Sequence, residues 1–218
     1  LTQFVSSFFW FYGINGPAVI NTAFAPIGLA LTTENLDAFK NGLPLPNIFT
    51  NGFSNFFTNF GGGGSTLALV FLMVGIAKSK RMKTLGRLAI VPGIFGINEM
   101  IIFGLPVVLN PIMLVPFIAT PLVNTILSII ATVIGFLPRT TGVSIPWTTP
   151  FFFSGWLATG HLIAGFWQII LIAIDCLIYY PFFKVMDRQF LAEEEKPEQD
   201  LKDDLDDISL DDLSFDDL

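Results

Sequence analysis

The 218-residue chain is 52% hydrophobic, contains 24 Phe and has a mean hydropathy of +0.66. Only 13% of its residues are charged, about half the roughly 25% that is typical of soluble domains. So few charges cannot easily cover a soluble globule of this size. A single Cys and a single His exclude a disulfide framework and the common zinc patterns, so we expect no metal and no cofactor. No basic patch with interleaved aromatic residues supports nucleic-acid binding.

The acidic residues are concentrated at the C-terminal end. Residues 191–218 hold 13 of the 18 acids and two of the 11 bases, whereas residues 1–190 hold nine bases and five acids. The C-terminal segment repeats Asp-Asp-Leu/Ile units, and such dense like charge is typical of disordered chains. The sequence therefore predicts a membrane domain over residues 1–190 and an acidic, disordered tail over residues 191–218.

The N-terminal part of the chain alternates apolar and irregular stretches. An apolar block over Leu1–Leu31 is interrupted at Gly13–Pro17. A connection rich in Asn, Gly, Pro and Phe follows over Thr32–Gly64, and then a short apolar block over Ser65–Ala77. Because the chain begins at Leu1 without a charged leader, it does not resemble a signal peptide, and we interpret it as a cut through a longer protein.

The C-terminal part contains two uninterrupted and two interrupted apolar blocks. Pro111–Leu137 and His161–Met186 are each long enough to cross a bilayer, which takes about 20 residues. Leu88–Leu109 and Pro138–Gly160 are each broken by several Gly and Pro residues. Irregular backbone at membrane depth is tolerated only where it is buried in protein or lines a wet cavity, and paired broken segments often mark a transporter's binding site.

The positions of the basic residues predict a topology. The basic cluster Lys78–Arg87 and the later bases Lys184 and Arg188 should all be cytoplasmic by the positive-inside rule. An even number of crossings must then separate them, and the two uninterrupted blocks supply two. Each interrupted block therefore enters and leaves on one side. The expected fold is an all-α integral membrane protein with two re-entrant hairpins and a cytoplasmic tail.

Glu99 is the most informative polar residue, because no other acid occurs between Asp37 and Asp175. A carboxylate within an apolar block is costly and is by default a functional group with a partner or ligand nearby. A carboxylate can accept two hydroxyl hydrogen bonds from a sugar, and the adjacent Asn98 can both donate and accept. The alternative is a structural carboxylate that caps the backbone N–H groups of its own hairpin.

Trp147 lies in the second interrupted block. The face of an indole ring matches the apolar C–H face of a pyranose, and the indole N–H can donate to a hydroxyl. The alternative is an aromatic residue of the membrane interface. Four weaker candidates have structural interpretations. We interpret His161 as a residue at the membrane boundary, Cys176 as a packed thiol, Asp175 as a helix-packing acid and Gly61–Gly64 as a flexible turn.

Several segments resemble one known family. Ala77–Lys83, Gly86–Leu88 and Pro92–Phe95 resemble the membrane component, enzyme IIC (EIIC), of the sugar phosphotransferase system, in its lactose/cellobiose/diacetylchitobiose branch. Ile97–Pro106 is similar to the Asn-Glu-Pro signature of that family, with Met100 in place of the Pro. The resemblance is collinear over roughly residues 8–190 and continues through Leu109–Pro111, Ile145–Pro150, Ser154–Gly155, Ala158–Gly160 and Ile178–Lys184.

The resemblance implies the substrate-binding, C-terminal half of a homodimeric permease in a bacterial cell membrane. Such a permease holds a disaccharide in a cavity while a phosphocysteine of the partner EIIB phosphorylates the C6 hydroxyl of the sugar. It implies sugar contacts by Glu99, with Asn98 beside it, and by Trp147. It also places Asn15 where the family has the His of a Gly-Ile-His-Gly loop. Because Asn15 can bond a hydroxyl but cannot act as an imidazole base, Glu99 is the candidate catalytic base.

Two other functions remain open from the sequence. The first is a truncated remnant that inserts into the membrane without transporting, because half of the family fold is missing. The second is a secondary transporter that couples sugar to protons through Glu99 and Asp175. The sequence does not name the sugar, since preference for a linkage depends on the shape of the cavity.

Overall fold

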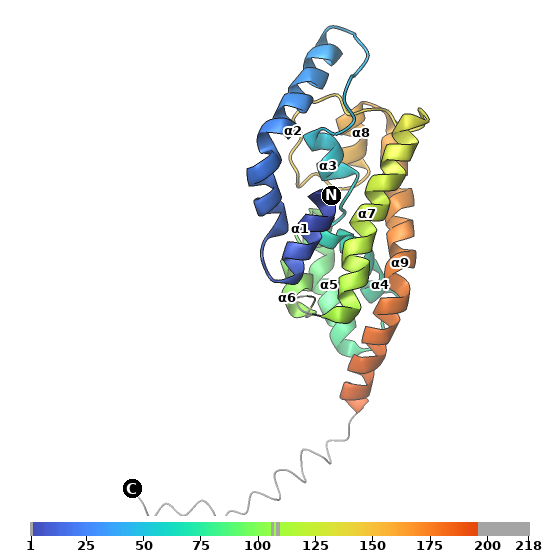
Figure 1. Cartoon of the computed structure of the whole chain (residues 1–218). Coiled ribbons are helices and arrows are strands. Elements are labelled where there is room, and N and C mark those ends of the chain that lie inside the picture. Colours follow the sequence, from blue (N-terminus) through green and yellow to red (C-terminus); the bar gives the residue numbers. More distant parts are fainter. Residues whose placement is uncertain (1, 106, 108–109, 196–218) are drawn as a thin grey trace, which may run out of the picture.

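The computed structural model describes residues 2–105, 107 and 110–195 (Figure 1). Within these residues every regular element is helical and no strand occurs, which confirms the expected all-α chain for this part. The acidic segment beyond residue 195 lies outside the described residues. The elements are α1 (Thr2–Phe11), α2 (Gly16–Lys40), α3 (Asn51–Phe56), the 3-10 turn η1 (Gly63–Ser65), α4 (Leu67–Ile76), α5 (Lys80–Ile94), α6 (Glu99–Gly104), α7 (Pro111–Val133), α8 (Phe153–Thr159) and α9 (Leu162–Glu195).

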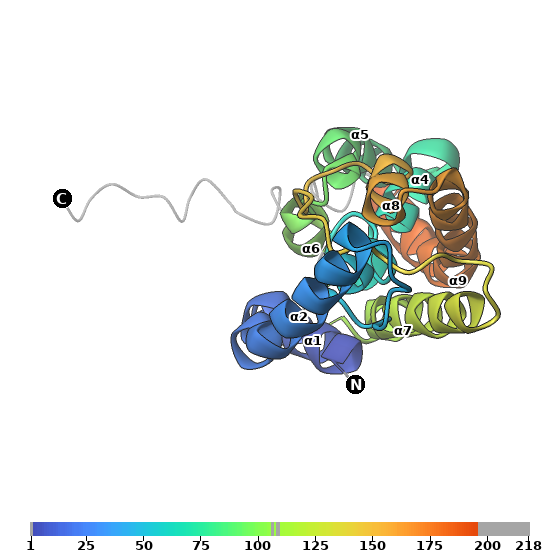
Figure 2. The ribbon, with the colours of Figure 1, turned by 90° about the horizontal axis from the view of Figure 1, so that it is seen from above.

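Two helices, α7 and α9, are long and apolar enough to cross a membrane, and they lie against each other (Figures 1 and 2). Asn110 caps the start of α7, because its side-chain oxygen accepts a hydrogen bond from the backbone N–H of Ile112 at 2.9 Å. The helix ends at Val133, before the expected Leu137, and Gly135 adopts a positive φ of 83° just beyond it. Both uninterrupted apolar blocks are therefore helices, with ends that differ from the expected ones.

The short helix α4 packs between α5 and α9 and forms part of the main apolar core. Its buried side chains include Leu69 and Met73, which belong to the same core cluster as Tyr179 and Phe183 of α9. Helix α5 approaches α4 closely at Gly86, where a Cβ atom would lie 2.7 Å from the Cβ of Met73. Any larger residue at that position would force the two helices apart.

Acidic side chains of α9 cap the first turn of α5. Asp187 accepts hydrogen bonds from the backbone N–H groups of Lys78 at 2.9 Å and Ser79 at 3.0 Å. Glu194 accepts from the next two backbone N–H groups at 3.0 and 2.9 Å. Carboxylates stabilise a helix N-terminus, where N–H groups lack helical partners. The start of the basic segment and the end of α9 therefore lie together, and their expected cytoplasmic location stays a prediction. The expected domain boundary at 190/191 falls inside α9, which continues to Glu195.

The segment expected as a connection, Thr32–Gly64, is helical over its first nine residues, and the expectation was wrong there. Helix α2 continues to Lys40 because these residues are polar without breaking a helix, and the hydroxyl of Thr32 donates to the carbonyl of Gly28 at 2.6 Å. The helix stops at the turn residues Asn41-Gly42. The polar composition of Thr32–Lys40 was taken as a sign of irregular structure. Polar residues alone do not end a helix, and α2 ends only at the turn residues Asn41-Gly42.

The chain reverses direction in the region of each interrupted block. After α5, the chain turns at Phe95–Asn98 and continues into α6. The end of α6 lies against α5, because a Cβ atom placed on Gly104 would lie 2.7 Å from Cδ1 of Leu85. In the second block, the backbone N–H of Thr141 donates to the carbonyl of Ala158 at 2.8 Å, so its entry and exit are adjacent. We call residues 80–104, which only partly overlap the expected block Leu88–Leu109, hairpin 1, and we call residues 138–160 hairpin 2.

The tips of the two hairpins meet. Gly96, at the turn of hairpin 1, has a φ of 85°, and a Cβ atom there would lie 3.5 Å from the six-membered ring of Trp147 in hairpin 2. The positive φ favours glycine, and the missing side chain leaves room for the indole. Two segments about 50 residues apart in the sequence are thus joined by one aromatic contact.

Asn35 fastens the end of α2 to the rest of the molecule. Its buried side chain donates to the carbonyls of Asn47 at 2.9 Å and Thr140 at 2.8 Å, and it accepts from the backbone N–H of Asn47 at 2.9 Å. We expect Asn35→Ala to lower the free energy of unfolding by about 1–3 kcal/mol, because buried backbone groups lose their partners. Chemical unfolding in detergent measures this effect.

The matched control is Asn41→Ala, at an exposed amide that bonds only to the carbonyl of Asp37 in its own helix end. This change should cost less than about 1 kcal/mol. Equal effects of the two substitutions would show that Asn35 does not hold these segments together.

Candidate functional site

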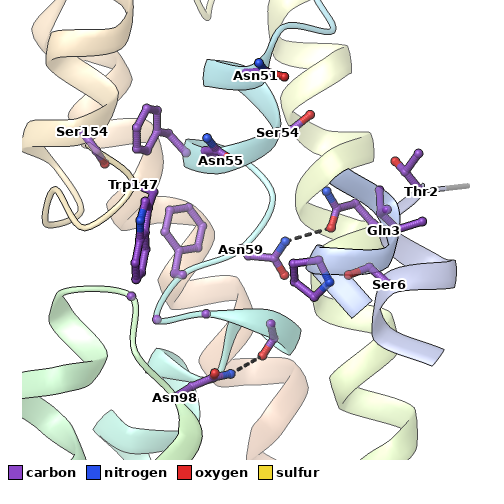
Figure 3. A pocket seen from close by; sticks show the side chains of 18 of the residues that line it. Thr2, Gln3, Ser6, Asn51, Ser54, Asn55, Asn59, Asn98, Trp147 and Ser154 are labelled. Carbon is purple, nitrogen blue, oxygen red and sulfur yellow. Dashed lines mark hydrogen bonds between the residues drawn. The ribbon is translucent and has the colours of Figure 1, made fainter. Parts of the chain in front are cut away.

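A cavity of about 750 Å³ lies between helices α1–α3 and the tips of the two hairpins. Figure 3 shows side chains that converge on it from several elements: Gln3 and Ser6 of α1 face Trp147 across the space, and Asn98 lies below. Amides and hydroxyls alternate with aromatic rings along the wall. Glu99 is the one charged side chain among the described residues that line it.

All four residues singled out in the sequence line this one cavity: Asn15, Asn98, Glu99 and Trp147. They come from three separate parts of the chain, namely the start of α2, the tip of hairpin 1 and the tip of hairpin 2. The structure therefore brings together residues that are up to 132 positions apart in the sequence.

Asn98 is buried and held by a glycine turn. Its side-chain Nδ2 donates to the carbonyl of Gly63 at 2.8 Å. A Cβ atom at Gly62 would lie 2.5 Å from the side-chain carbon Cγ of Asn98, so only glycine permits this approach. Because one side-chain donor is committed to the turn, the orientation of the amide is fixed before any ligand arrives.

Glu99 occupies the first turn of α6, and its side chain is exposed. It forms no hydrogen bond or ion pair with the part of the chain that the structure describes. The alternative interpretation, in which this carboxylate caps its own hairpin, therefore has no support in the structure. Both carboxylate oxygens remain able to accept hydrogen bonds from a ligand in the cavity.

Trp147 presents a largely open ring to the cavity, and 62% of the residue is exposed. Trp147 lies in a tight turn of hairpin 2, in which the backbone N–H of Thr149 donates to the carbonyl of Pro146 at 3.0 Å. One part of the indole rests on Gly96, which limits its movement. This position in the cavity wall favours contact with a ligand over a role in the membrane interface.

Asn15 is the N-cap of α2. Its side-chain oxygen accepts a hydrogen bond from the backbone N–H of Ala18 at 3.1 Å. The oxygen is thereby committed to the helix, and the exposed Nδ2 group is left as a donor toward the cavity. Sequence reasoning identified the position and missed the capping role, although Asn followed by Gly-Pro is typical of a helix start.

Three further amides of the cavity wall were missed in the sequence: Asn51, Asn55 and Asn59. Figure 3 shows them on the segment that descends through α3, and the Nδ2 of Asn59 donates to the side-chain oxygen of Gln3 at 2.8 Å. Their spacing of four residues was the available signal, because it places side chains on one side of a helical segment.

Of the weaker candidates, His161, Cys176 and Asp175 do not line the cavity, whereas the glycines Gly61–Gly63 do. His161 is exposed elsewhere, and the thiol of Cys176 donates to the carbonyl of Ala68 at 3.7 Å, which agrees with the structural interpretations. Asp175 is buried and hydrogen bonded within the bundle, as expected for a helix-packing acid. The segment Gly61–Gly64 is a turn, as expected, and it is closely packed and hydrogen bonded to neighbouring elements.

The cavity is suited to a neutral, polyhydroxylated ligand. One carboxylate, several amides and hydroxyls, and open aromatic faces can bond hydroxyl groups and cover the apolar faces of sugar rings. Within residues 2–105, 107 and 110–195, no three His, Cys, Asp or Glu side chains cluster as metal ligands would. No basic side chain from the described residues is available in the wall to bind an anion.

Comparison with known proteins agrees with this chemistry. A family model described as "Phosphotransferase system, EIIC" matches residues 1–121, more than half of the chain. The chain belongs to this EIIC family. It is 45% identical over 195 residues to the lichenan permease IIC component of Bacillus subtilis (strain 168), and 41% identical over 192 residues to the lactose-specific EIICB component of Staphylococcus aureus. These alignments cover 89% and 86% of the chain.

The fold has a solved counterpart in the crystal structure of ChbC, the IIC component of the N,N'-diacetylchitobiose-specific phosphotransferase system. The two share a TM-score of 0.88 and 41% identity, over 89% of this chain and 45% of ChbC. The alignments above cover 43% of the lichenan permease component and 33% of the lactose EIICB component. This chain therefore spans less than half the length of these EIIC relatives.

The packing of Asn98 on the glycine turn leads to a stability prediction. Gly62 has a φ of 89° and leaves no room for a Cβ beside Asn98. Gly135 has a similar φ of 83° with no atom within 4 Å of a Cβ position. Both alanine substitutions carry the same backbone cost of about 1 kcal/mol. We expect Gly62→Ala to lower the melting temperature in detergent more than Gly135→Ala, and equal shifts would contradict the fixed placement of Asn98.

Proposed function

We propose that this EIIC chain forms the sugar-binding part of a disaccharide permease of the cellobiose, lactose or chitobiose type. The observation that carries the proposal is the meeting of Asn15, Asn98, Glu99 and Trp147 in one cavity of about 750 Å³. The Glu99 carboxylate has no partner among the described residues. A cavity of this size falls within the range of about 300–1,000 Å³ that is usual for small-molecule sites. The names of the relatives, which include a lichenan permease IIC component and a lactose-specific EIICB component, support a sugar of this class.

Each residue has a separate role in the proposed complex. Glu99 accepts hydrogen bonds from two sugar hydroxyls, and Asn98 offers its remaining hydrogen-bonding capacity next to it. Trp147 stacks on the apolar face of one pyranose ring. Asn15 donates from Nδ2 to a hydroxyl and makes a secondary contact, because its oxygen already caps α2.

We propose that the bound sugar is phosphorylated by a phosphocysteine of EIIB. In this step a bond forms between the C6 oxygen and phosphorus while the phosphorus–sulfur bond breaks, and the cysteine leaves as a thiolate. The proton of the C6 hydroxyl passes to a base, for which the Glu99 carboxylate is the candidate. Asn15 supplies no base at the position where the family motif has His, so Glu99 acts alone in this role.

We propose an arrangement in the membrane that is supported by the two long apolar helices and by the positions of the basic residues. Helices α7 and α9 cross a bacterial cell membrane, and hairpins 1 and 2 enter it from opposite sides and return. The basic end of α5 and the C-terminal acidic tail are cytoplasmic, where EIIB docks. The complete permease is a homodimer. Irregular backbone at both hairpin tips is accommodated because it lines the sugar cavity.

The proton-coupled alternative receives no support from the geometry. It requires Glu99 and Asp175 to act in one pathway, but Asp175 does not line the cavity and is bonded within the bundle. A remnant without transport remains distinguishable by experiment, because it would insert into the membrane and fail to deliver sugar in any variant.

The Glu99→Gln substitution tests the proposed function. We expect it to abolish sugar uptake and to leave membrane insertion intact, because the amide keeps the shape of the side chain and cannot accept at both positions or take a proton. Uptake of labelled disaccharide by whole cells measures the effect. The control is Asp37→Asn, at an exposed acid outside the cavity. Normal uptake in the Glu99→Gln variant would remove this residue from the mechanism.

A further inference from the structure

A second polar cluster lies inside the bundle, away from the cavity wall. It joins the glycine turn Gly61–Ser65 to α7 and α9 through Ser65, Asn124 and Asp175, all of which have an exposed fraction of 0%. The hydroxyl of Ser65 and the Nδ2 of Asn124 both donate to Oδ2 of Asp175, the latter at 2.9 Å. Two donors from two elements therefore converge on a single oxygen of a buried acid.

The other oxygens of this cluster have no partner. Within the described part of the chain, Oδ1 of Asp175 and Oδ1 of Asn124 are buried and form no hydrogen bond. Neither atom can donate when the acid is ionised, so the two acceptors cannot satisfy each other. Buried polar atoms without partners are rare, and each one requires an explanation.

Among the described residues, no ion pair compensates the acid. Helices α4, α7 and α8, which pack against α9, contain no titratable residue. Helix α5 also packs against α9 and carries Lys80, Arg81, Lys83 and Arg87, but none of these bases forms an ion pair with Asp175. The nearest titratable groups on α9 itself are Cys176 and Tyr179, and each donates its hydrogen to a backbone carbonyl, at 3.7 and 2.6 Å. An isolated buried carboxylate without a counter-charge is strongly disfavoured relative to its neutral form.

We propose that Asp175 holds a proton on Oδ1 and forms a reciprocal acid–amide pair with Asn124. The acid hydroxyl donates to Oδ1 of Asn124, while Nδ2 of Asn124 donates to Oδ2 of Asp175. One bound proton thus gives a partner to both orphaned oxygens and removes a buried charge. Asp175 is a structural proton site inside the bundle.

The protonated pair positions the proposed sugar site through the glycine turn. Ser65 bonds to Asp175 on one side and accepts from the backbone N–H of Phe60 at 3.1 Å on the other. Two residues earlier, the carbonyl of Gly63 accepts from Asn98 in the cavity wall. Asp175 is therefore a positioning residue, and this consequence rests on the proposed sugar-binding function.

Infrared spectroscopy of the protein in membranes tests the proton directly. We expect the carbonyl-stretch band of a protonated carboxylic acid at neutral pH, shifted in deuterated water and missing from Asp175→Asn. The control Asp37→Asn, at an exposed acid, should keep the band. Absence of the band from the unmodified protein, or its persistence in Asp175→Asn, would overturn the proposal.

Sugar binding tests the positioning role with two substitutions. Asp175→Asn places an amide N–H₂ and an oxygen where the neutral acid has its hydroxyl and carbonyl, so it should retain sugar affinity. Asp175→Ala removes both bonds and should weaken binding by at least about tenfold. Equal weakening in both variants would contradict a neutral acid. A protonated-acid band without any sugar binding would leave the proton site intact and refute the proposed function instead.

Discussion

The glycine turn between α3 and α4 is the constraint on which the rest of the structure depends. Its irregular backbone runs through the interior, where every carbonyl and N–H group needs a partner. Side chains of α7 and α9 supply them, because Thr120 and Tyr179 both donate to the carbonyl of Gly64 at 2.8 and 2.6 Å. The neighbouring carbonyl of Gly63 is bonded by Asn98. The same turn therefore joins the two long helices to the cavity.

This arrangement explains how a cavity can be polar inside an apolar bundle. The long helices α7 and α9 direct four buried polar side chains at the turn, namely Thr120, Asn124, Asp175 and Tyr179. The turn itself lines one wall of the cavity through Gly61–Gly63. The two hairpin tips close the cavity from other directions, and they meet through Gly96 and Trp147. Among the described residues, Glu99 is the one charged side chain of the cavity wall, and it lies next to neutral amides, which suits a hydroxyl-rich, uncharged ligand.

Much of the architecture was predictable from local patterns, and the rest depends on tertiary contacts. Long charge-free blocks predicted α7 and α9. Clustered Gly and Pro residues predicted irregular backbone near both hairpin tips, and the re-entrant course of the hairpins in a membrane stays a prediction. The cost of an isolated carboxylate identified Glu99. In contrast, the end of α2 was misjudged because polar residues were taken as irregular. The amide–amide pair of Asn59 and Gln3 could not be foreseen, since it joins residues 56 positions apart. Likewise, only packing shows that Ser65 meets Asp175.

The most direct test of the account supplies phosphorylated EIIB and a panel of β-linked disaccharides to membranes of cells that express the native gene. The account predicts a sugar 6-phosphate from one member of the panel, since the cavity offers binding groups and a candidate base. Formation of that product would establish group translocation and identify the substrate. Sugar binding with no phosphorylated product from any disaccharide would contradict the account, and would point to Asn15 and a permease whose chemistry has changed.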